Sequence, residues 1–127
     1  GLNMDNARRF PTPLSLLGKV LGTAAPLDYA LGETTLSPDW IAGVIMLFRR
    51  DAFEKLGGFD ERYFLYYEDV DLCWRLRCSG YDVRLVPSVG VTHEAKHASH
   101  RDVRYMRSHL RSMLRFLLTS RFGLTRP

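Results

Sequence analysis

The sequence predicts an α/β fold of the α+β type, with a short mixed sheet, flanking helices and a long C-terminal helix. Three observations predict it. Hydrophobic residues make up 46% of the 127 positions, enough for the core of one compact domain. Short strand-like apolar runs alternate with segments of helical periodicity. The last quarter of the chain combines helically spaced apolar residues with many arginines.

The N-terminal region, residues 1–39, is expected to be an irregular segment with one short helix. Pro13 is well placed to open this helix, because the first turn does not need the amide hydrogen that proline lacks. Residues 22–39 contain two glycines, two prolines and little periodicity, so they are predicted to form a loop.

The middle region, residues 40–98, is expected to hold most of the ordered elements. A continuous apolar run favours a buried strand, and each helix should end where a glycine can take the left-handed conformation. The expected elements are a strand over 42–48, a helix over 50–56, a loop over 57–67, a helix over 68–79, and strands over 82–86 and 89–93.

The C-terminal region, residues 99–127, is predicted to be an amphipathic basic helix, with its helical pattern running from 99 to 119. Its apolar residues are expected to form one buried stripe. The members of this stripe are Val103, Met106, Leu110, Met113 and Leu117.

Charge is concentrated in the same region. The net charge is +4, and arginines crowd the C-terminal quarter at positions 101, 104, 107, 111, 115, 121 and 126. Such a face suits an anionic membrane surface or a diphosphate. We expect no nucleic-acid partner, because the sequence has neither a zinc finger nor an aromatic RNA-binding motif. No apolar run approaches the roughly 18–20 residues that a membrane-spanning helix needs.

The two cysteines indicate a reducing compartment. Cys73 and Cys78 are five residues apart on one predicted helix and therefore face different directions, so they should not pair. Free buried thiols, as expected for both cysteines, fit a reducing cytosol. We therefore expect a cytoplasmic protein. The basic helix adds a second expectation, which is peripheral attachment to the inner face of the plasma membrane.

An acid pair, Glu68-Asp69, stands where the helix over 68–79 should begin. A carboxylate fixed at a helix N-terminus can act as a general base, since the helix dipole favours its charged form. The alternative is a purely structural role, because acids are common in any first helical turn and Asp71 and Arg75 can form an ordinary i,i+4 pair.

The residues around the acid pair resemble family 2 glycosyltransferases of the inverting GT-A type, with the rhamnosyl- and galactofuranosyl-transferase-like members most similar. The resemblance runs from about residue 40 to 99, and residues 8–11 also fit. The matching motifs are Gly57-Gly58-Phe59-Asp60, the aromatic run Tyr63-Phe64-Leu65-Tyr66-Tyr67, Glu68-Asp69, Asp71-Leu72 and Arg75.

This resemblance implies a sugar transferase that moves a sugar from a nucleotide-sugar to a polysaccharide- or lipid-linked acceptor. It assigns Asp69 as the catalytic base and Glu68 as its neighbour in the acceptor pocket. It also places Trp40, Gly43 and Asp60 at the acceptor, where an indole face suits a sugar ring. The alternatives are a packed core tryptophan, ordinary turn glycines and an aspartate that caps its own loop.

The resemblance further implies a divalent metal, Mn²⁺ or Mg²⁺, in the full-length enzyme. His93 would be one ligand, and imidazole suits Mn²⁺ better than Mg²⁺. Ser99 would lie near the donor diphosphate. A histidine that merely ends a strand is the alternative for His93. We expect no tightly bound metal in this chain by itself.

Residues 93–97 also match the zinc-peptidase pattern HExxH, which gives a competing function. The strand-like residues before His93 argue against it, because that motif lies on a helix. A third hypothesis is a non-catalytic membrane-surface or binding module that uses the arginine-rich helix.

The donor half of the resembled family has no counterpart in this sequence. No Asp-x-Asp follows a buried strand, and no glycine-rich nucleotide loop occurs. The sequence therefore predicts the C-terminal, acceptor-binding part of an incomplete GT-A-like fold, which alone would be inactive. Exposed apolar sheet edges would favour a homodimer.

Overall fold

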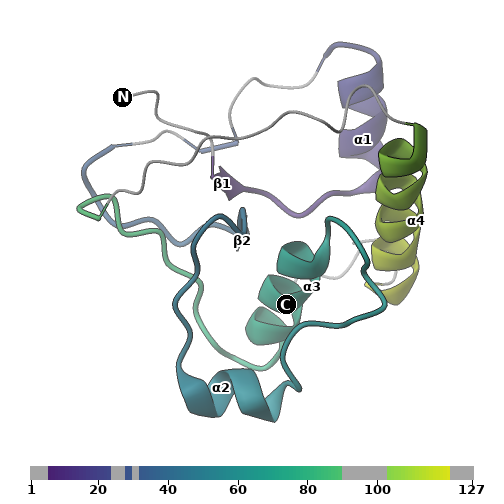
Figure 1. The fold of residues 1–127 in the computed structure, drawn as a ribbon. Coiled ribbons are helices and arrows are strands. Elements are labelled where there is room, and N and C mark those ends of the chain that lie inside the picture. The colour runs from purple at the N-terminus through teal and green to yellow at the C-terminus, as the bar shows by residue number, and fades with distance from the viewer. Residues whose placement is uncertain (1–5, 24–27, 30–31, 90–102, 121–127) are drawn as a thin grey trace.

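The computed structural model describes residues 6–23, 28–29, 32–89 and 103–120 of the chain (Figure 1). Within them it contains a two-stranded sheet and helices, a mixed α/β arrangement that agrees with the predicted class at this coarse level. The elements are β1 (Ala7–Arg8), α1 (Pro13–Val20), β2 (Trp40–Ile41), α2 (Arg50–Lys55), α3 (Glu68–Cys78) and α4 (Val103–Thr119). No helix among the described residues is long and apolar enough to cross a membrane.

The helices lie close to where the sequence predicted them. Thr12 caps α1 in a capping box, in which its hydroxyl accepts from the Ser15 amide at 3.1 Å and the Ser15 hydroxyl accepts from the Thr12 amide at 2.9 Å. Gly57 and Gly80 follow α2 and α3 with φ of +73° and +81°, the left-handed conformation expected after a helix. The residues 99–102 of the predicted last helix lie outside the described part of the chain.

The strands were predicted less well. The expected strand over 42–48 is wrong, because the last pairing hydrogen bond is from Ala42 to Asn6 and the chain then turns at Gly43 and Val44. Residues 82–86 contribute only one isolated bridge, between Leu85 and Leu36. The strand predicted over 89–93 falls almost wholly outside the described residues. In the described sheet, β1 and β2 are antiparallel, with Ala7 opposite Ile41, so the mixed sheet is not present there.

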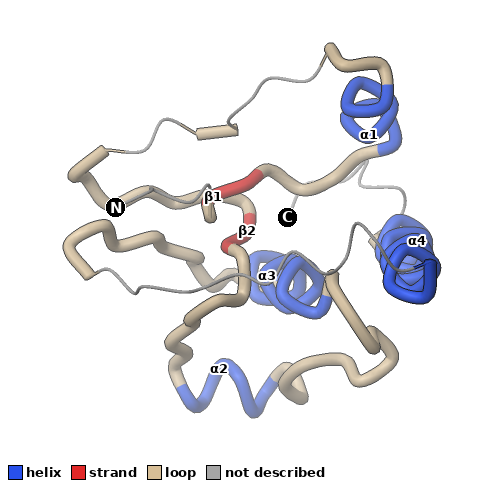
Figure 2. Tube along the Cα trace, turned by 45° about the horizontal axis from the view of Figure 1, so that its top comes forward, coloured by secondary structure: helices blue, strands red, loops and turns tan. Residues whose placement is uncertain are grey.

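The core forms around α3, which lies between β2 and α4 (Figure 2). Leu72 and Cys73 on α3 are fully buried. Three aromatic rings connect α3 to the rest of the core: Phe10 meets Trp74 edge-on with ring centroids 5.0 Å apart, and Phe116 of α4 lies 6.1 Å from Trp74 and 6.2 Å from Phe10. Neither cysteine forms a disulfide, as predicted, and Cys73 is buried. The expectation of a buried thiol is wrong for Cys78, which lies exposed at the end of α3.

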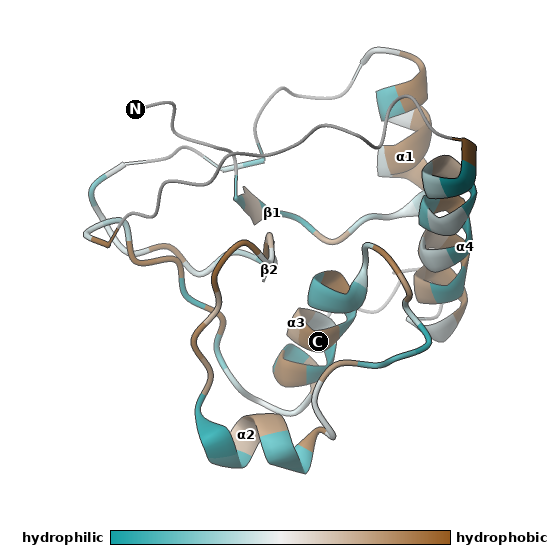
Figure 3. Cartoon of the chain, viewed as in Figure 1, coloured by the Kyte–Doolittle hydropathy of each residue, from teal (hydrophilic) through white to brown (hydrophobic). Residues whose placement is uncertain are grey.

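Helix α4 buries only the C-terminal part of the predicted stripe, where Leu117 is buried and Met113 packs against the core as expected. Its buried residues are Ser112, Phe116 and Leu117. Val103 and Met106 of the predicted stripe are exposed. Phe116 packs in the aromatic cluster with Phe10 and Trp74, so the C-terminal half of α4 is the part that contacts the core. Apolar and polar residues therefore remain mixed on the outside of α4 (Figure 3).

Candidate active site

The acid pair begins α3, as the sequence predicted, but the backbone leading into it is unusual. Tyr66 and Tyr67 have φ of 61° and 71°, and non-glycine residues rarely take this left-handed conformation, least of all twice in succession. Tyr67 is the N-cap residue of α3 and makes no side-chain cap. Such backbone strain concentrates at functional sites. Nothing in the residue types of an aromatic loop signals it in advance.

Asp69 is half-buried and is fixed by backbone amides. Its Oδ2 accepts from the Gly43 amide at 2.9 Å, and its Oδ1 accepts from the Val70 amide at 2.8 Å. Burial raises the pKa of the Asp69 carboxyl above its ordinary 3.8, and the amide donors of Gly43 and Val70 oppose that rise. The carboxylate is thus held in one position and made more basic than an exposed aspartate.

Gly43 and Asp69, which the sequence placed in one pocket, are in direct contact. A Cβ added to Gly43 would lie 3.3 Å from both the Cβ and the Oδ2 of Asp69, which is tighter than most such contacts. Any larger residue at position 43 would push against the carboxylate. The backbone needs glycine here for close approach and not for a positive φ.

Glu68 is the least satisfied acid of the site. Its Oε2 is buried and has no hydrogen-bond partner in the described structure. Burial, with a smaller contribution from the Asp69 charge, raises the pKa of Glu68 above its ordinary 4.5. A buried oxygen without a partner leaves a hydrogen-bonding requirement unmet in the described structure.

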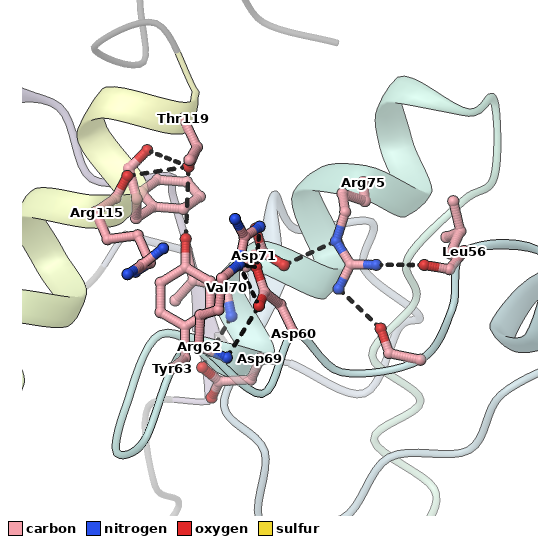
Figure 4. Close-up of polar contacts among 12 residues, drawn as sticks. Leu56, Asp60, Arg62, Tyr63, Asp69, Val70, Asp71, Arg75, Arg115 and Thr119 are labelled. Atoms are coloured by element: carbon pink, nitrogen blue, oxygen red, sulfur yellow. Dashed lines mark hydrogen bonds and ion pairs between the residues drawn. The ribbon is translucent and has the colours of Figure 1, made fainter.

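Asp71 has a structural role instead. It is only 6% exposed, and its Oδ2 accepts from Nε of Arg75 at 2.7 Å. The same guanidinium donates to the carbonyls of Leu56 and Gly58, both at 2.8 Å, as Figure 4 shows. Arg75 therefore ties the glycine loop after α2 to the first turns of α3. The sequence predicted the ion pair but not these two carbonyl contacts.

Asp60 is occupied within its own loop. It accepts from the Arg62 amide at 3.0 Å and pairs with the Arg62 guanidinium at 2.7 Å. This hydrogen bonding holds the pKa of Asp60 down to about 2. In the described structure Asp60 thus caps its loop, which was one of the two interpretations the sequence left open.

Trp40 lies partly buried against the core, and its indole Nε1 donates to the carbonyl of Arg9 at 2.9 Å. Its ring therefore belongs to the scaffold beneath Gly43. Its role at an acceptor stays a prediction.

The predicted metal and diphosphate residues, His93 and Ser99, lie outside the described residues, as does the whole HExxH segment. In the part of the chain that is described, no three His, Cys, Asp or Glu side chains gather closely enough to hold a metal ion. The metal site therefore stays a prediction.

The aromatic loop before the acid pair is supported by α4. The ring of His109 lies 5.1 Å from the ring of Tyr66 and 5.6 Å from that of Tyr67, measured between centroids. The Ser112 hydroxyl donates to the Leu65 carbonyl at 2.9 Å. The C-terminal helix thus helps to hold the strained residues that position the acids.

Comparison with known proteins identifies the family of the chain. Residues 17–126 match the model of glycosyl transferase family group 2. The chain is 44% identical over 85 residues to an N-acetylglucosaminyl-diphospho-decaprenol L-rhamnosyltransferase of Mycobacterium tuberculosis, covering 66% of this chain and 28% of that protein. It is 34% identical over 121 residues to the rhamnosyltransferase WbbL of Escherichia coli, covering 91% of this chain and 45% of that protein.

A hexosyltransferase of low-salt glycan biosynthesis from Haloferax volcanii is also similar, at 30% identity over 84 residues, covering 65% of this chain and 27% of that protein. No solved structure matches significantly. The chain spans less than half the length of these curated relatives. The family match covers most of the chain, including residues 93–97, and it gives the peptidase alternative no support. The chain therefore belongs to glycosyl transferase family group 2, a family of enzymes that transfer sugars.

Proposed function

We propose that this chain is the C-terminal, acceptor-binding part of an inverting glycosyltransferase and that Asp69 is its general base. One observation carries the proposal: the Asp69 carboxylate is fixed by the Gly43 amide at 2.9 Å and stands beside a buried, unpartnered oxygen of Glu68. A fixed base next to an unsatisfied acceptor group is what a sugar hydroxyl needs for binding and deprotonation.

The reaction would proceed in one displacement. The acceptor hydroxyl oxygen forms a bond to the anomeric carbon of the donor sugar while the bond from that carbon to the nucleotide diphosphate breaks. The hydroxyl proton passes to Asp69, and the diphosphate leaves with the electron pair. Each Asp69 oxygen accepts one amide hydrogen bond and keeps a second lone pair for this proton. Displacement from the opposite face inverts the anomeric centre.

The other site residues would bind and orient. Glu68 would accept from a second acceptor hydroxyl through its unpartnered Oε2. Gly43 would orient Asp69, with Trp40 supporting the turn beneath it. Asp60, held by Arg62, would border the acceptor pocket as part of the glycine loop.

The substrates are proposed from the relatives. Two are named as rhamnosyltransferases, and the name of one gives N-acetylglucosaminyl-diphospho-decaprenol as its acceptor. We infer a nucleotide-activated rhamnose or related hexose as donor and a lipid-linked or polysaccharide-linked sugar as acceptor. The place of action would be the cytoplasm, at the membrane that holds such an acceptor. A homodimer remains a further prediction from the sequence.

The donor side would need chain beyond the described residues. His93 would contribute to a divalent metal, Mn²⁺ or Mg²⁺, and Ser99 would border the diphosphate. The metal would supply positive charge at the leaving diphosphate.

Asp69→Asn tests the proposal in the full-length polypeptide that carries this sequence. The measurement is transfer of labelled rhamnose from its nucleotide-sugar to a lipid-linked N-acetylglucosamine diphosphate. We expect the variant to lose about 10²–10⁴-fold in rate, the usual contribution of a positioned base. Donor binding should be unchanged. An Asp69→Asn enzyme with near-normal rate would remove Asp69 from the mechanism.

A second measurement needs no donor. We expect a soluble N-acetylglucosamine diphosphate to bind the 127-residue chain and to lose affinity in Glu68→Ala. Arg50→Ala, on the surface of α2, serves as the control. Equal binding by both variants would exclude Glu68 from the acceptor pocket.

A further inference from the structure

Two rows of side chains run along the outer face of α4. Leu110, Leu114 and Leu118 form one row at four-residue spacing and are 50%, 56% and 66% exposed. An arginine row with the same spacing runs beside it, because residues four apart on a helix are neighbours on its surface. The arginine row consists of Arg107 and Arg111, which are exposed, and Arg115, which is half-buried. The face therefore combines exposed leucines with positive charge.

No acidic residue lies on α4 beside these arginines. Residues 103–119 contain no aspartate or glutamate. Among the described residues, no ion pair joins Arg107, Arg111 or Arg115 to an acid. The two rows border an open depression of about 710 Å³ rather than an enclosed cavity. The lining residues are Arg107, Leu110, Arg111, Leu114, Arg115, Leu118 and Thr119.

We propose that this outer face of α4, which we call the arginine-leucine face, docks on an anionic lipid surface. A helix that lies in the membrane interface inserts apolar side chains at the boundary of the acyl chains while its lysines and arginines meet the phosphates. Juxtamembrane arginines are attracted to the negative potential of anionic lipids. Both requirements are met on one side of one helix.

Helix α1 extends the same edge of the molecule, since it lies beside α4 at that edge in two views (Figures 1 and 2). None of its residues is buried. Leu14, Leu17 and Val20 are exposed. Lys19 gives α1 a positive charge as well. A second short helix with exposed apolar residues widens the area that a lipid surface could cover.

A second copy of the chain fits this face less well than lipid does. Pairing two arginine-leucine faces would bring two arginine rows together with no acid on either helix, and like charges at close range repel. Lipid phosphates supply the missing negative charge. The inference goes beyond the proposed catalysis, because it depends on no residue of the acid pair.

Vesicle flotation of the 127-residue chain tests the inference. We expect binding to phosphatidylcholine vesicles that contain phosphatidylglycerol, little binding to phosphatidylcholine alone, and loss of binding as salt rises. Arg107→Gln/Arg111→Gln should weaken binding roughly 25-fold, at about fivefold for each arginine. The control Arg50→Gln/Arg84→Gln removes the same charge from other exposed sites and should bind as wild type.

A pair of leucine variants tests the apolar row. Leu118→Ser should weaken binding, whereas Leu47→Ser, at a fully exposed leucine elsewhere, should not. Circular dichroism checks that each variant folds. Equal binding to neutral and anionic vesicles, or equal loss in the control variants, would overturn the proposal. No vesicle binding together with a dimer that Leu118→Ser dissociates in sedimentation would assign the face to a second copy instead.

Discussion

Asp69 shows how single residues set the chemistry of this site. Its carboxylate is positioned by two backbone amides, so its place depends on the path of the chain and on no flexible side chain. Burial raises the pKa of the Asp69 carboxyl. The two amide hydrogen bonds partly offset this rise, because they stabilise the carboxylate. In its proposed role as the base, Asp69 would be both oriented and reactive.

Gly43 should be intolerant of a side chain. In Gly43→Ala the new Cβ would meet Asp69 at 3.3 Å and displace its carboxylate. Small displacements of reacting groups are costly, so we expect transfer by the full-length enzyme to fall roughly 10- to 100-fold with little change in melting temperature. Gly32→Ala is the matched control, since nothing lies within 4 Å of its added Cβ. Equal rates in the two variants would contradict the role given to Gly43.

Glu68 should weaken the fold when it is charged. Its pKa is raised above 4.5 by burial, so the folded state binds the proton more tightly than the unfolded state does. The stability that this group contributes is present below pH 4.5 and is lost as pH rises through its raised pKa. Glu68→Gln is therefore expected to raise the melting temperature at neutral pH.

The gain in melting temperature of Glu68→Gln should disappear in acid, where the wild-type carboxyl is protonated. Thermal melts of wild type and Glu68→Gln across the acid range provide the measurement. A gain that stays constant with pH would show that charge burial is not its cause.

At the scale of elements, the join between α2 and α3 depends on one guanidinium. Arg75 reaches Asp71 and two carbonyls at 2.7–2.8 Å. We expect Arg75→Met to lower the free energy of unfolding by about 3–5 kcal/mol, because it leaves the buried Asp71 without its partner. Denaturant unfolding measures this.

The control is Arg50→Met, which breaks the exposed pair with Glu54 on α2. Pairs of this kind contribute about 0.3–0.5 kcal/mol. Similar losses of unfolding free energy in the two variants would show that Arg75 contributes no more than an exposed ion pair does.

Elements that are determined by residues within their own segment could be predicted from the sequence. Elements that depend on contacts with distant parts of the chain could not. Helix α3 has acids at its start and a glycine after its end, all within its own segment, and it was predicted within one residue. The strand expected over 42–48 needs a partner strand, and its residue types do not reveal whether one is beside it. The exposure of the N-terminal half of the α4 stripe was missed, because the helix is held to the core through Phe116 and Phe10, and Phe10 is over a hundred positions away in the sequence.

The same distinction holds at the site. The contact between Gly43 and Asp69 and the Asp71–Arg75 pair were expected from motif and spacing, and both occur in the structure. The left-handed Tyr66 and Tyr67 were not expected, because their conformation is imposed by packing against His109 and not by their own preference.

At the scale of the whole molecule, the described part of the chain leaves large apolar side chains uncovered. Leu47 is fully exposed and Ile45 is 65% exposed, both directly after β2. No nucleotide-binding motif occurs in the sequence. We therefore expect the 127-residue chain by itself not to transfer sugar in the assay used for the full-length polypeptide. Transfer by this chain alone at a comparable rate would contradict that expectation.

Helix α4 has the arginine-leucine face on one side and the loop before the acid pair on the other. An α-helix with its side chains is about 10–12 Å across. If the outer side rests on lipid, α4 acts as a spacer of that thickness between the bilayer and the catalytic carboxylate. An acceptor sugar attached close to the acyl chains would fall short of Asp69, whereas one raised on a diphosphate stem would reach it. The helix would then select substrates by the height of their polar stem, independently of the length of the lipid tail below.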